Sequence, residues 1–175
     1  MPELTIRIKK KTDGNAALSC IRADGSTTWQ RQEGAQGAFF PLHDLTHYSV
    51  ETVLGFRRAF YGLVSEGWDL SSFGDRATGH AIPDEAELAE VIVGFFDVER
   101  ATGVVSSADD FNWKIRTYRE NKNLAPTSFE MTTDALARIR AKRSELFASW
   151  RALPPGETMT LAFPEPTAQG DHRPR

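Results

Sequence analysis

Hydrophobic and polar residues alternate along the N-terminal part of the chain. In residues 4–9, Leu or Ile alternates with Thr, Arg or Lys, which is the period-two pattern of a half-buried strand. Two Asp-Gly pairs, at 13–14 and 24–25, separate this run from strand-like stretches at 16–22 and 27–31. Asp-Gly between two such stretches is a strong hairpin signal. The pattern therefore predicts three antiparallel strands within the first ~32 residues.

Further along the chain, apolar residues recur at helical spacing in three long segments. The first predicted helix covers about 42–65, with Gly67 in the position of a C-cap residue. The second begins with Pro83-Asp84-Glu85 and ends at Gly103, and the third covers about 133–153. The predicted buried stripes consist of Leu88, Val91, Ile92, Phe95 and Val98 in the second helix, and of Leu136, Ile139, Leu146, Phe147 and Trp150 in the third.

Together these segments predict an α+β fold. A small antiparallel β-sheet, made of the N-terminal hairpin strands plus a C-terminal strand at 158–163, packs against about three α-helices. Residues 106–128 show mixed composition and remain unassigned. We expect a single domain over 1–163, since 175 residues lie within the usual size of one domain. The Pro-rich, polar stretch 164–175 is expected to be a disordered tail.

Composition narrows the function classes. The formal net charge of -3 argues against a dedicated nucleic-acid binder. Bases and aromatics do interleave at 113–122, and further bases lie on the third predicted helix. We interpret these as an ordinary loop and a solvated helix face; contacts to nucleic acid or to an anionic substrate are the alternatives. Cys20 is the only cysteine, which excludes an intramolecular disulfide and a cysteine-based zinc cluster. No apolar run approaches the ~20 residues of a membrane span, and the first residues do not resemble a signal peptide, so we expect a cytoplasmic protein.

The main chemical signal is the run His43-Asp44-Leu45-Thr46-His47 in the first predicted helix. On a helix, His43 and His47 lie about 40° apart around the axis and ~6 Å apart along it. Two imidazoles at that spacing can coordinate one divalent ion. Glu51 lies one turn further along the same face, where it could bind the ion together with His47 or orient the His47 ring.

A further ligand has to come from another element. Glu87, Glu90 and Asp97 share one side of the second predicted helix, and His80 lies in the preceding loop. Glycine in a helix interior costs roughly 1 kcal/mol relative to alanine, so it often marks close approach of another backbone. Gly55 and Gly62 beside the histidine face, and Gly94 beside Glu90, predict such close packing. The predicted metal ligands are His43, His47, Glu51 and Glu90.

The histidine run resembles two known zinc motifs. It is similar to the H-E-x-x-H motif of zincin proteases, with Asp44 in place of the catalytic glutamate, and Glu66 stands at the separation of the third ligand in the glutamate-type zincins. A helix continuous over 48–65 would leave no turn to bring Glu66 back, which argues against a protease. The run also resembles the H-D-x-x-H motif of an accessory protein of ubiquinone biosynthesis, but Ala59 stands where that family has a glutamate. Each resemblance covers five residues.

These signals favour a metal-dependent enzyme, most simply a hydrolase, which binds Zn²⁺ or, as alternatives, Fe or Mn. A metal-bound water would be the nucleophile. Asp44 or Glu51 would be the base or an orienting group, and Arg58 would stabilise developing negative charge. The partner is then a small-molecule substrate that the sequence does not identify. Assembly into a homo-oligomer is compatible with the sequence. The alternative is a non-catalytic binding or assembly module in which the histidines and Glu51 form a structural cluster.

Overall fold

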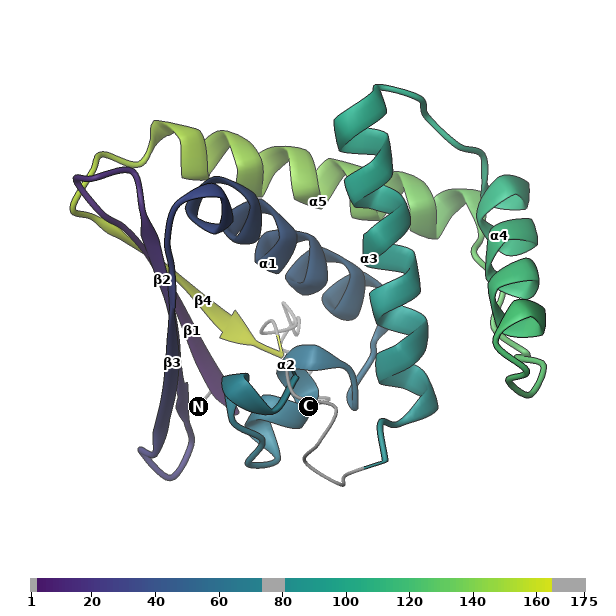
Figure 1. Cartoon of the computed structure of the whole chain (residues 1–175), viewed down its shortest axis with the longest axis horizontal. Coiled ribbons are helices and arrows are strands. Elements are labelled where there is room, and N and C mark those ends of the chain that lie inside the picture. The colour runs from purple at the N-terminus through teal and green to yellow at the C-terminus, as the bar shows by residue number, and fades with distance from the viewer. Residues whose placement is uncertain (1–2, 74–80, 165–175) are drawn as a thin grey trace, which may run out of the picture.

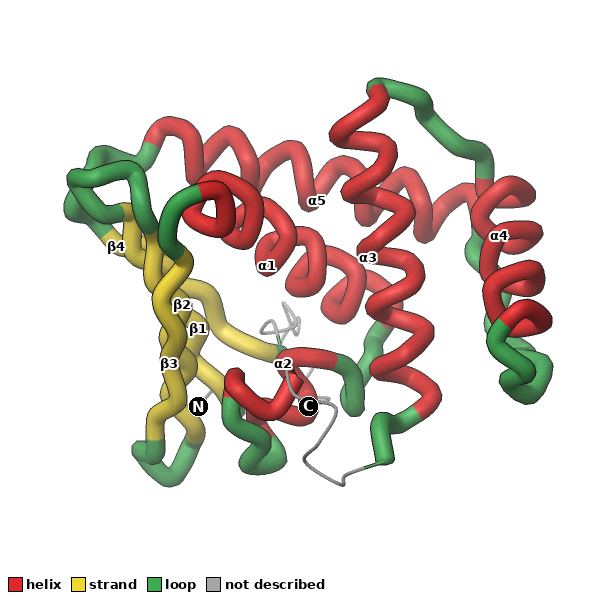
Figure 2. The backbone as a smooth tube through the Cα atoms, viewed as in Figure 1, coloured by secondary structure: helices red, strands yellow, loops and turns green. Residues whose placement is uncertain are grey.

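A four-stranded sheet lies on one side of the molecule and the helices lie on the other (Figures 1 and 2). The computed structural model describes residues 3–73 and 81–164. The strands are β1 (Leu4–Lys10), β2 (Ala16–Arg22), β3 (Thr27–Gln32) and β4 (Thr158–Phe163), all antiparallel in the order β3-β2-β1-β4. The α+β fold predicted from the sequence is confirmed.

The predicted strands all occur. The chain turns at Gly14 and Gly25, which adopt φ values of 82° and 84°, where glycine is favoured. The last strand returns to the N-terminal sheet, where Phe163 of β4 pairs with Leu4 of β1. The inward-facing residues of β1 and β2 are fully buried against the helices, as the period-two pattern requires.

The described residues form five α-helices instead of about three. They are α1 (Ala35–Leu54), α2 (Phe60–Ser65), α3 (Asp84–Thr102), α4 (Ala108–Asn121) and α5 (Thr133–Ala152), with a short 3₁₀ helix, η1 (Leu70–Phe73), after α2. The central helix α1 contacts the sheet on one side and both α3 and α5 on the other (Figure 1). Helix α4 accounts for much of the segment that the sequence left unassigned.

The predicted continuous helix over 42–65 is wrong. Helix α1 begins earlier, at Ala35, and ends at Leu54, because Gly55 adopts a left-handed conformation with φ 71°. The backbone N–H groups of Gly55 and Phe56 both donate to the carbonyl oxygen of Glu51. Gly55 therefore ends the helix as a C-cap residue and does not mark a close contact.

The other two glycines, Gly62 and Gly94, differ in how closely other atoms approach them. A Cβ atom added at Gly62 would overlap the carbonyl oxygen of Arg57, so the predicted close approach is present and comes from the loop that precedes α2. A Cβ added at Gly94 would meet nothing within 4 Å. The close packing predicted at Gly94 is therefore wrong.

Helices α3 and α5 agree with the predicted segments. Gly103 ends α3 with φ 73°, and the Thr132 side chain caps α5 by accepting a hydrogen bond from the backbone N–H of Ala135 at 3.1 Å. Most of the predicted apolar stripes face the core. The exception is Val98, which is 56% exposed, because the buried face of α3 is rotated toward Ala89, Val93 and Phe96.

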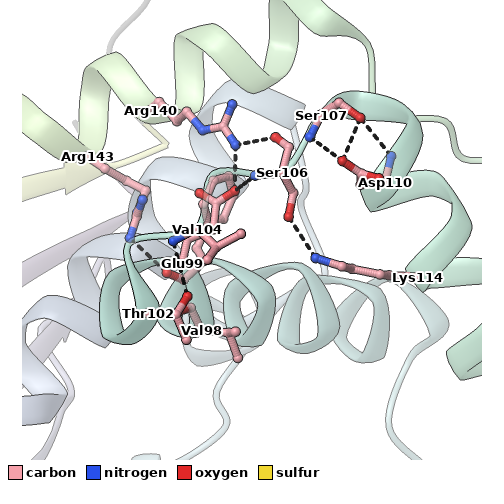
Figure 3. A network of polar contacts seen from close by, with 11 residues as sticks. Val98, Glu99, Thr102, Val104, Ser106, Ser107, Asp110, Lys114, Arg140 and Arg143 are labelled. Carbon is pink, nitrogen blue, oxygen red and sulfur yellow. Dashed lines mark hydrogen bonds and ion pairs between the residues drawn. The ribbon is translucent and has the colours of Figure 1, made fainter.

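A polar network holds the far end of α3 against α4 and α5 (Figure 3). Arg140 of α5 reaches Glu99 of α3 at 2.5 Å and the carbonyl oxygen of Ser106 at 2.6 Å. The backbone N–H of Ser106 also donates to Glu99, and Lys114 of α4 donates to the Ser106 hydroxyl. These bonds fix the direction of α3 relative to the rest of the bundle.

Arg143 of α5 joins three helices beside the predicted site. Its guanidinium lies 4.5 Å from the Phe96 ring centroid and 5.0 Å from that of Phe147. Its Nε donates to the Thr46 hydroxyl of α1 at 3.2 Å. Burial lowers the pKa of Arg143 to about 10, still well above neutral pH. Because Thr46 lies between the two histidines in sequence, this contact positions the helix that carries them.

The apolar core has two parts. One lies between the sheet and α1, α2 and α5 and includes the fully buried Cys20, as expected for a core cysteine. The other lies among α1, α3, α4 and α5. In the described parts of the chain, no helix has the length and apolar character needed to cross a bilayer. His80 and the predicted tail beyond Pro164 lie outside the described residues.

Candidate metal centre

Two neighbouring helices supply the polar groups of the candidate site. Helix α1 places His43 and His47 one turn apart on one face, with ring centroids separated by 4.8 Å. Helix α3 packs against α1 and contributes Glu90 and Asp97, which are two turns apart on its facing side. Each carboxylate meets one of the histidines.

His47 lies between two glutamates. Its Nε2 atom is 3.3 Å from Glu90 Oε1, and its Nδ1 atom is 3.3 Å from Glu51 Oε1. Glu51 is fully buried, and its second oxygen accepts a hydrogen bond from the backbone N–H of Tyr61 at 3.0 Å. The turn after α1 brings Tyr61 back to this carboxylate, so the helix break that the sequence did not predict helps to fix the His47 ring.

His43 is held in a similar way. Its Nδ1 atom lies 2.6 Å from Asp97 Oδ2, and the other oxygen of Asp97 is 3.2 Å from Arg100. The carboxylates of Asp97 and Glu51 thus contact the Nδ1 atoms of both histidines, so each ring in its neutral form can present a lone pair at Nε2. A carboxylate on the distant ring nitrogen is the usual support of a metal-binding histidine.

His43, His47 and Glu90, here called the ligand triad, each offer one ligand atom, and these three atoms lie within 4.8 Å of one another. A tetrahedral zinc ion with bonds of about 2.0–2.1 Å would separate its ligand atoms by roughly 3.4 Å. Side-chain movements of roughly an ångström would therefore bring the triad onto one ion. Two imidazoles and one carboxylate form a donor set that fits zinc and also iron or manganese.

The electrostatics of the site favour a cation. Burial alone would lower the pKa of His47, but the carboxylates of Glu90 and Glu51 outweigh it and raise this pKa to about 10. Burial opposes ionisation of Glu90 and Asp97, yet the adjacent histidines outweigh it and lower both pKa values. Burial raises the pKa of Glu51, and Arg100 pairs with Asp97, so the ionised carboxylate of Glu90 is the negative group that faces both histidines at the triad.

Asp44 lies next to His43 in sequence and lines the same cavity, but it is held by a strand of the sheet. Its side chain is buried, and Oδ2 accepts a hydrogen bond from Nε2 of Gln32 at 2.6 Å. Burial raises the pKa of Asp44 to about 6, although the bond from Gln32 and the nearby histidines oppose the shift. Sequence reasoning identified Asp44 but not Gln32, because a pairing between β3 and α1 leaves no local pattern.

A cavity of about 280 Å³ opens beside the triad. Its polar end contains the triad and Asp44, and its walls are mainly aromatic or aliphatic side chains from α1, α2 and η1. Among the described residues, those that line it are Gln30, Phe40, His43, Asp44, His47, Phe60, Leu70, Phe73 and Glu90, and none of these is a lysine or arginine. The site therefore offers a negatively charged end and an apolar pocket.

Four further residues that the sequence indicated are not among the triad. Glu51 contacts the Nδ1 side of His47, away from Glu90, which fits an orienting role and not that of a fourth ligand to the triad. Arg58 is not brought to the cavity, since its guanidinium pairs with Glu66 at 3.1 Å on the surface. Glu87 is not part of the triad, and His80 lies outside the described residues.

Aromatic packing fixes the cavity wall on the side of α2 and η1. The Phe60 ring lies 5.1 Å from the His47 ring and 4.6 Å from the Phe73 ring, measured between centroids. No local sequence pattern indicated Phe73 or Leu70 as site residues, because their role depends on the turn after α1.

Comparisons with models of known protein families, with curated proteins and with solved structures find no match for this chain, so its function has to be inferred from its own residues.

Proposed function

We propose that this protein is a metal-dependent enzyme, most simply a hydrolase, with a divalent ion bound by Nε2 of His43, Nε2 of His47 and a carboxylate oxygen of Glu90. One observation carries the proposal: the ligand triad converges while both Nδ1 atoms are held by carboxylates. Zinc is the expected ion. Iron or manganese at the same donors would change the chemistry, since iron bound by two histidines and one carboxylate often activates oxygen.

The position of Glu90 argues against a purely structural cluster. Its side chain is 52% exposed and lines the cavity, whereas His47 is almost completely buried. Three protein ligands leave at least one coordination position for water or substrate on the cavity side. When bound, the ion would acidify this water and polarise a substrate carbonyl group.

The remaining polar residues have supporting roles in this proposal. Asp44 lies on the cavity wall and would accept the proton of the attacking water, while Gln32 holds its carboxylate in place. Asp97 and Glu51 would keep the two imidazoles oriented through Nδ1. Arg58 has no role here, because it lies at the surface with Glu66.

The cavity favours a small substrate with an apolar or aromatic group. Phe40, Phe60 and Phe73 form its apolar wall, and the described lining residues offer no cation for a phosphate or carboxylate. We therefore propose a neutral ester, amide or similar acyl compound as the substrate class. We also propose a cytoplasmic location. Cys20 has no role in the proposed chemistry, because it is buried in the core.

Metal content provides the first test. The untagged protein is purified and analysed by mass spectrometry for zinc, iron and manganese, beside the double variant His43→Ala/His47→Ala and the single variant Glu90→Ala. Glu87→Ala, which removes a carboxylate from the same helix outside the triad, is the matched control. We expect near-stoichiometric metal in the wild type and in Glu87→Ala, and strongly reduced metal in the two triad variants.

The alternative of a non-catalytic binding or assembly module predicts a different result. The wild type would then contain no metal, even after incubation with each ion, and His43→Ala would lower stability with no metal dependence. Circular dichroism on all variants shows whether each one folds. Metal in the wild type that persists in Glu90→Ala and in the double variant would place the ion elsewhere and contradict the proposed site.

A further inference from the structure

The sheet has a second face that none of the described helices covers (Figure 2). Because side chains alternate along a strand, residues that do not face the helices form this outer face. Strand pairing arranges them in rows across the sheet. One row contains Thr160, Arg7, Ser19 and Trp29, and the next contains Thr158, Lys9, Ala17 and Arg31.

The strand residues of the outer face carry only positive charge, and the carboxylate of Glu33, just after β3, lies 3.9 Å from the Arg31 guanidinium. Arg7, Lys9 and Arg31 are exposed there, and none of the residues in β1, β2, β3 and β4 is acidic. The whole chain has 24 acidic residues against 21 basic ones. The net charge of -3 is thus an average that conceals a basic face, and it does not predict which ligands this face attracts.

An exposed indole lies beside these cations. Trp29 on the edge strand β3 is 60% exposed, and the Arg31 guanidinium is 5.8 Å from its ring centroid. Between Trp29 and the bases on β1 lies a shallow hollow of about 230 Å³, with Ala17 and Ser19 as small residues in its floor. The hollow therefore combines a flat apolar surface for stacking with cations roughly two strand spacings, or about 10 Å, away.

We propose that the outer face binds single-stranded nucleic acid, with a base stacked on Trp29 and the backbone phosphates held by Arg7, Lys9 and Arg31. Aromatic side chains and cations on one open surface are the combination that single strands require, because every base has a stacking face and every linkage has a negative charge. Charge complementarity selects an anionic occupant over a basic or neutral partner, and the exposed Trp29 indole favours bases that can stack over an acidic peptide. A smooth duplex would leave Trp29 without an unstacked base. The inference is independent of the metal centre, which lies on the other side of the sheet.

Fluorescence anisotropy of a labelled twelve-nucleotide poly(dT) or poly(U) strand tests the proposal with the full-length protein. Three phosphate contacts predict that affinity falls by roughly 20-fold between 50 mM and 200 mM salt, from a slope of about −0.7 per phosphate contact. Trp29→Ala should weaken binding by about tenfold or more, and Trp29→Phe should retain most of the affinity, since a stacking ring remains. The double variant Arg7→Ala/Lys9→Ala should weaken binding and reduce the salt dependence to about a third.

The chain offers matched controls for both changes. Trp113 on α4 is 61% exposed, so Trp113→Ala removes an equally exposed indole from another surface. Arg116→Ala/Lys122→Ala removes two exposed charges at the same helix. Both controls should bind as the wild type does, and circular dichroism should show all variants folded.

Three outcomes would overturn the inference. The first is that no binding occurs at 50 mM salt up to millimolar protein. The second is that Trp29→Ala binds as tightly as Trp113→Ala, which would indicate nonspecific attraction of a polyanion. The third is that duplex DNA or vesicles with anionic lipid bind more tightly than the single strand, which would assign the face to a different partner.

Discussion

The carboxylate at Nδ1 determines the tautomer that each histidine adopts once it is neutral; His47, which also contacts Glu90 through Nε2, first has to lose a proton. A neutral imidazole that donates its Nδ1–H to Asp97 or Glu51 must present a lone pair at Nε2, which is the form that binds a metal ion. The spacing in the sequence places His43 and His47 on one helix face, but spacing alone does not decide between the tautomers. The carboxylates, which come from α3 and from the next turn of α1, supply that information.

Metal affinity should depend on pH through His47. Its folded-state pKa of about 10 means that the metal-free protein holds a proton there at neutral pH, and an incoming ion has to displace it. Between pH 7 and pH 9 we expect zinc affinity to rise about tenfold per pH unit, measured by competition with a chromophoric chelator. An affinity that is constant over this range would show that no such proton is displaced.

Asp44 should reduce the stability of the fold at neutral pH. Its folded pKa of about 6 lies above the ordinary value of 3.8, so the folded state binds the proton more tightly than the unfolded state does. The contribution of this group to stability is therefore fully present below about pH 4 and is lost as pH rises through about 6, with an upper limit of about 3 kcal/mol.

The variant Asp44→Asn tests whether Asp44 lowers the stability of the fold at neutral pH. Asparagine can still accept the hydrogen bond from Gln32 but carries no charge, so we expect the metal-free variant to unfold at a higher temperature than the wild type at pH 7.5. The difference should vanish near pH 4, where both side chains are neutral. Under the proposed mechanism the more stable variant has little activity, since the base is lost. An Asp44→Asn variant less stable than the wild type at pH 7.5 would contradict the burial argument.

At the scale of secondary structure, the sequence predicted the elements whose signals are local. Period-two alternation and Asp-Gly turns located the first three strands, and terminal Gly103 located the end of α3. The end of α1 was missed because the sequence does not show whether Gly55 lies inside a helix or ends one. The helical spacing of apolar residues also resumes in α2. Helix α4 was missed because it has few apolar residues, of which Phe111 and Ile115 are buried.

Two glycine-to-alanine substitutions should have opposite effects. Gly62→Ala places a methyl group against the Arg57 carbonyl oxygen, so we expect a loss of about 1–3 kcal/mol in unfolding free energy. Gly94→Ala adds a methyl group in open space within helix α3 and should stabilise by up to about 1 kcal/mol. Urea denaturation of both variants measures the difference, and a Gly94→Ala variant that is clearly destabilised would reveal a contact at that position.

At the scale of the whole molecule, the site depends on the packing of α1 against α3. From the sequence, Glu90 and Asp97 were candidate site carboxylates because they share one side of a helix. The histidines were candidate metal ligands because of their spacing. The sequence did not predict which carboxylate faces which ring nitrogen, nor that Arg58 would lie at the surface, because both depend on the angle between helices and on the turn after α1. Long-range contacts of this kind leave no pattern in one sequence.

A bound ion should link α1 to α3 and so stabilise the whole fold. At a free zinc concentration of 100 times the dissociation constant, the expected gain in unfolding free energy is about 2.7 kcal/mol, visible as a higher thermal midpoint. Glu87→Ala should show the same rise, and Glu90→Ala should show a much smaller one. An equal rise in Glu90→Ala would mean that the stabilising ion does not use this carboxylate.

The position of β1 in the sheet also affects how the protein folds as it is synthesised. Of the four strands of the sheet, β1 is synthesised first, and β2 can pair with it at once through a short hairpin. Its other neighbour, β4, is made about 150 residues later. Until then the open edge of β1 can pair with strands of other chains, so a nascent or truncated chain without β4 is the form most exposed to aggregation.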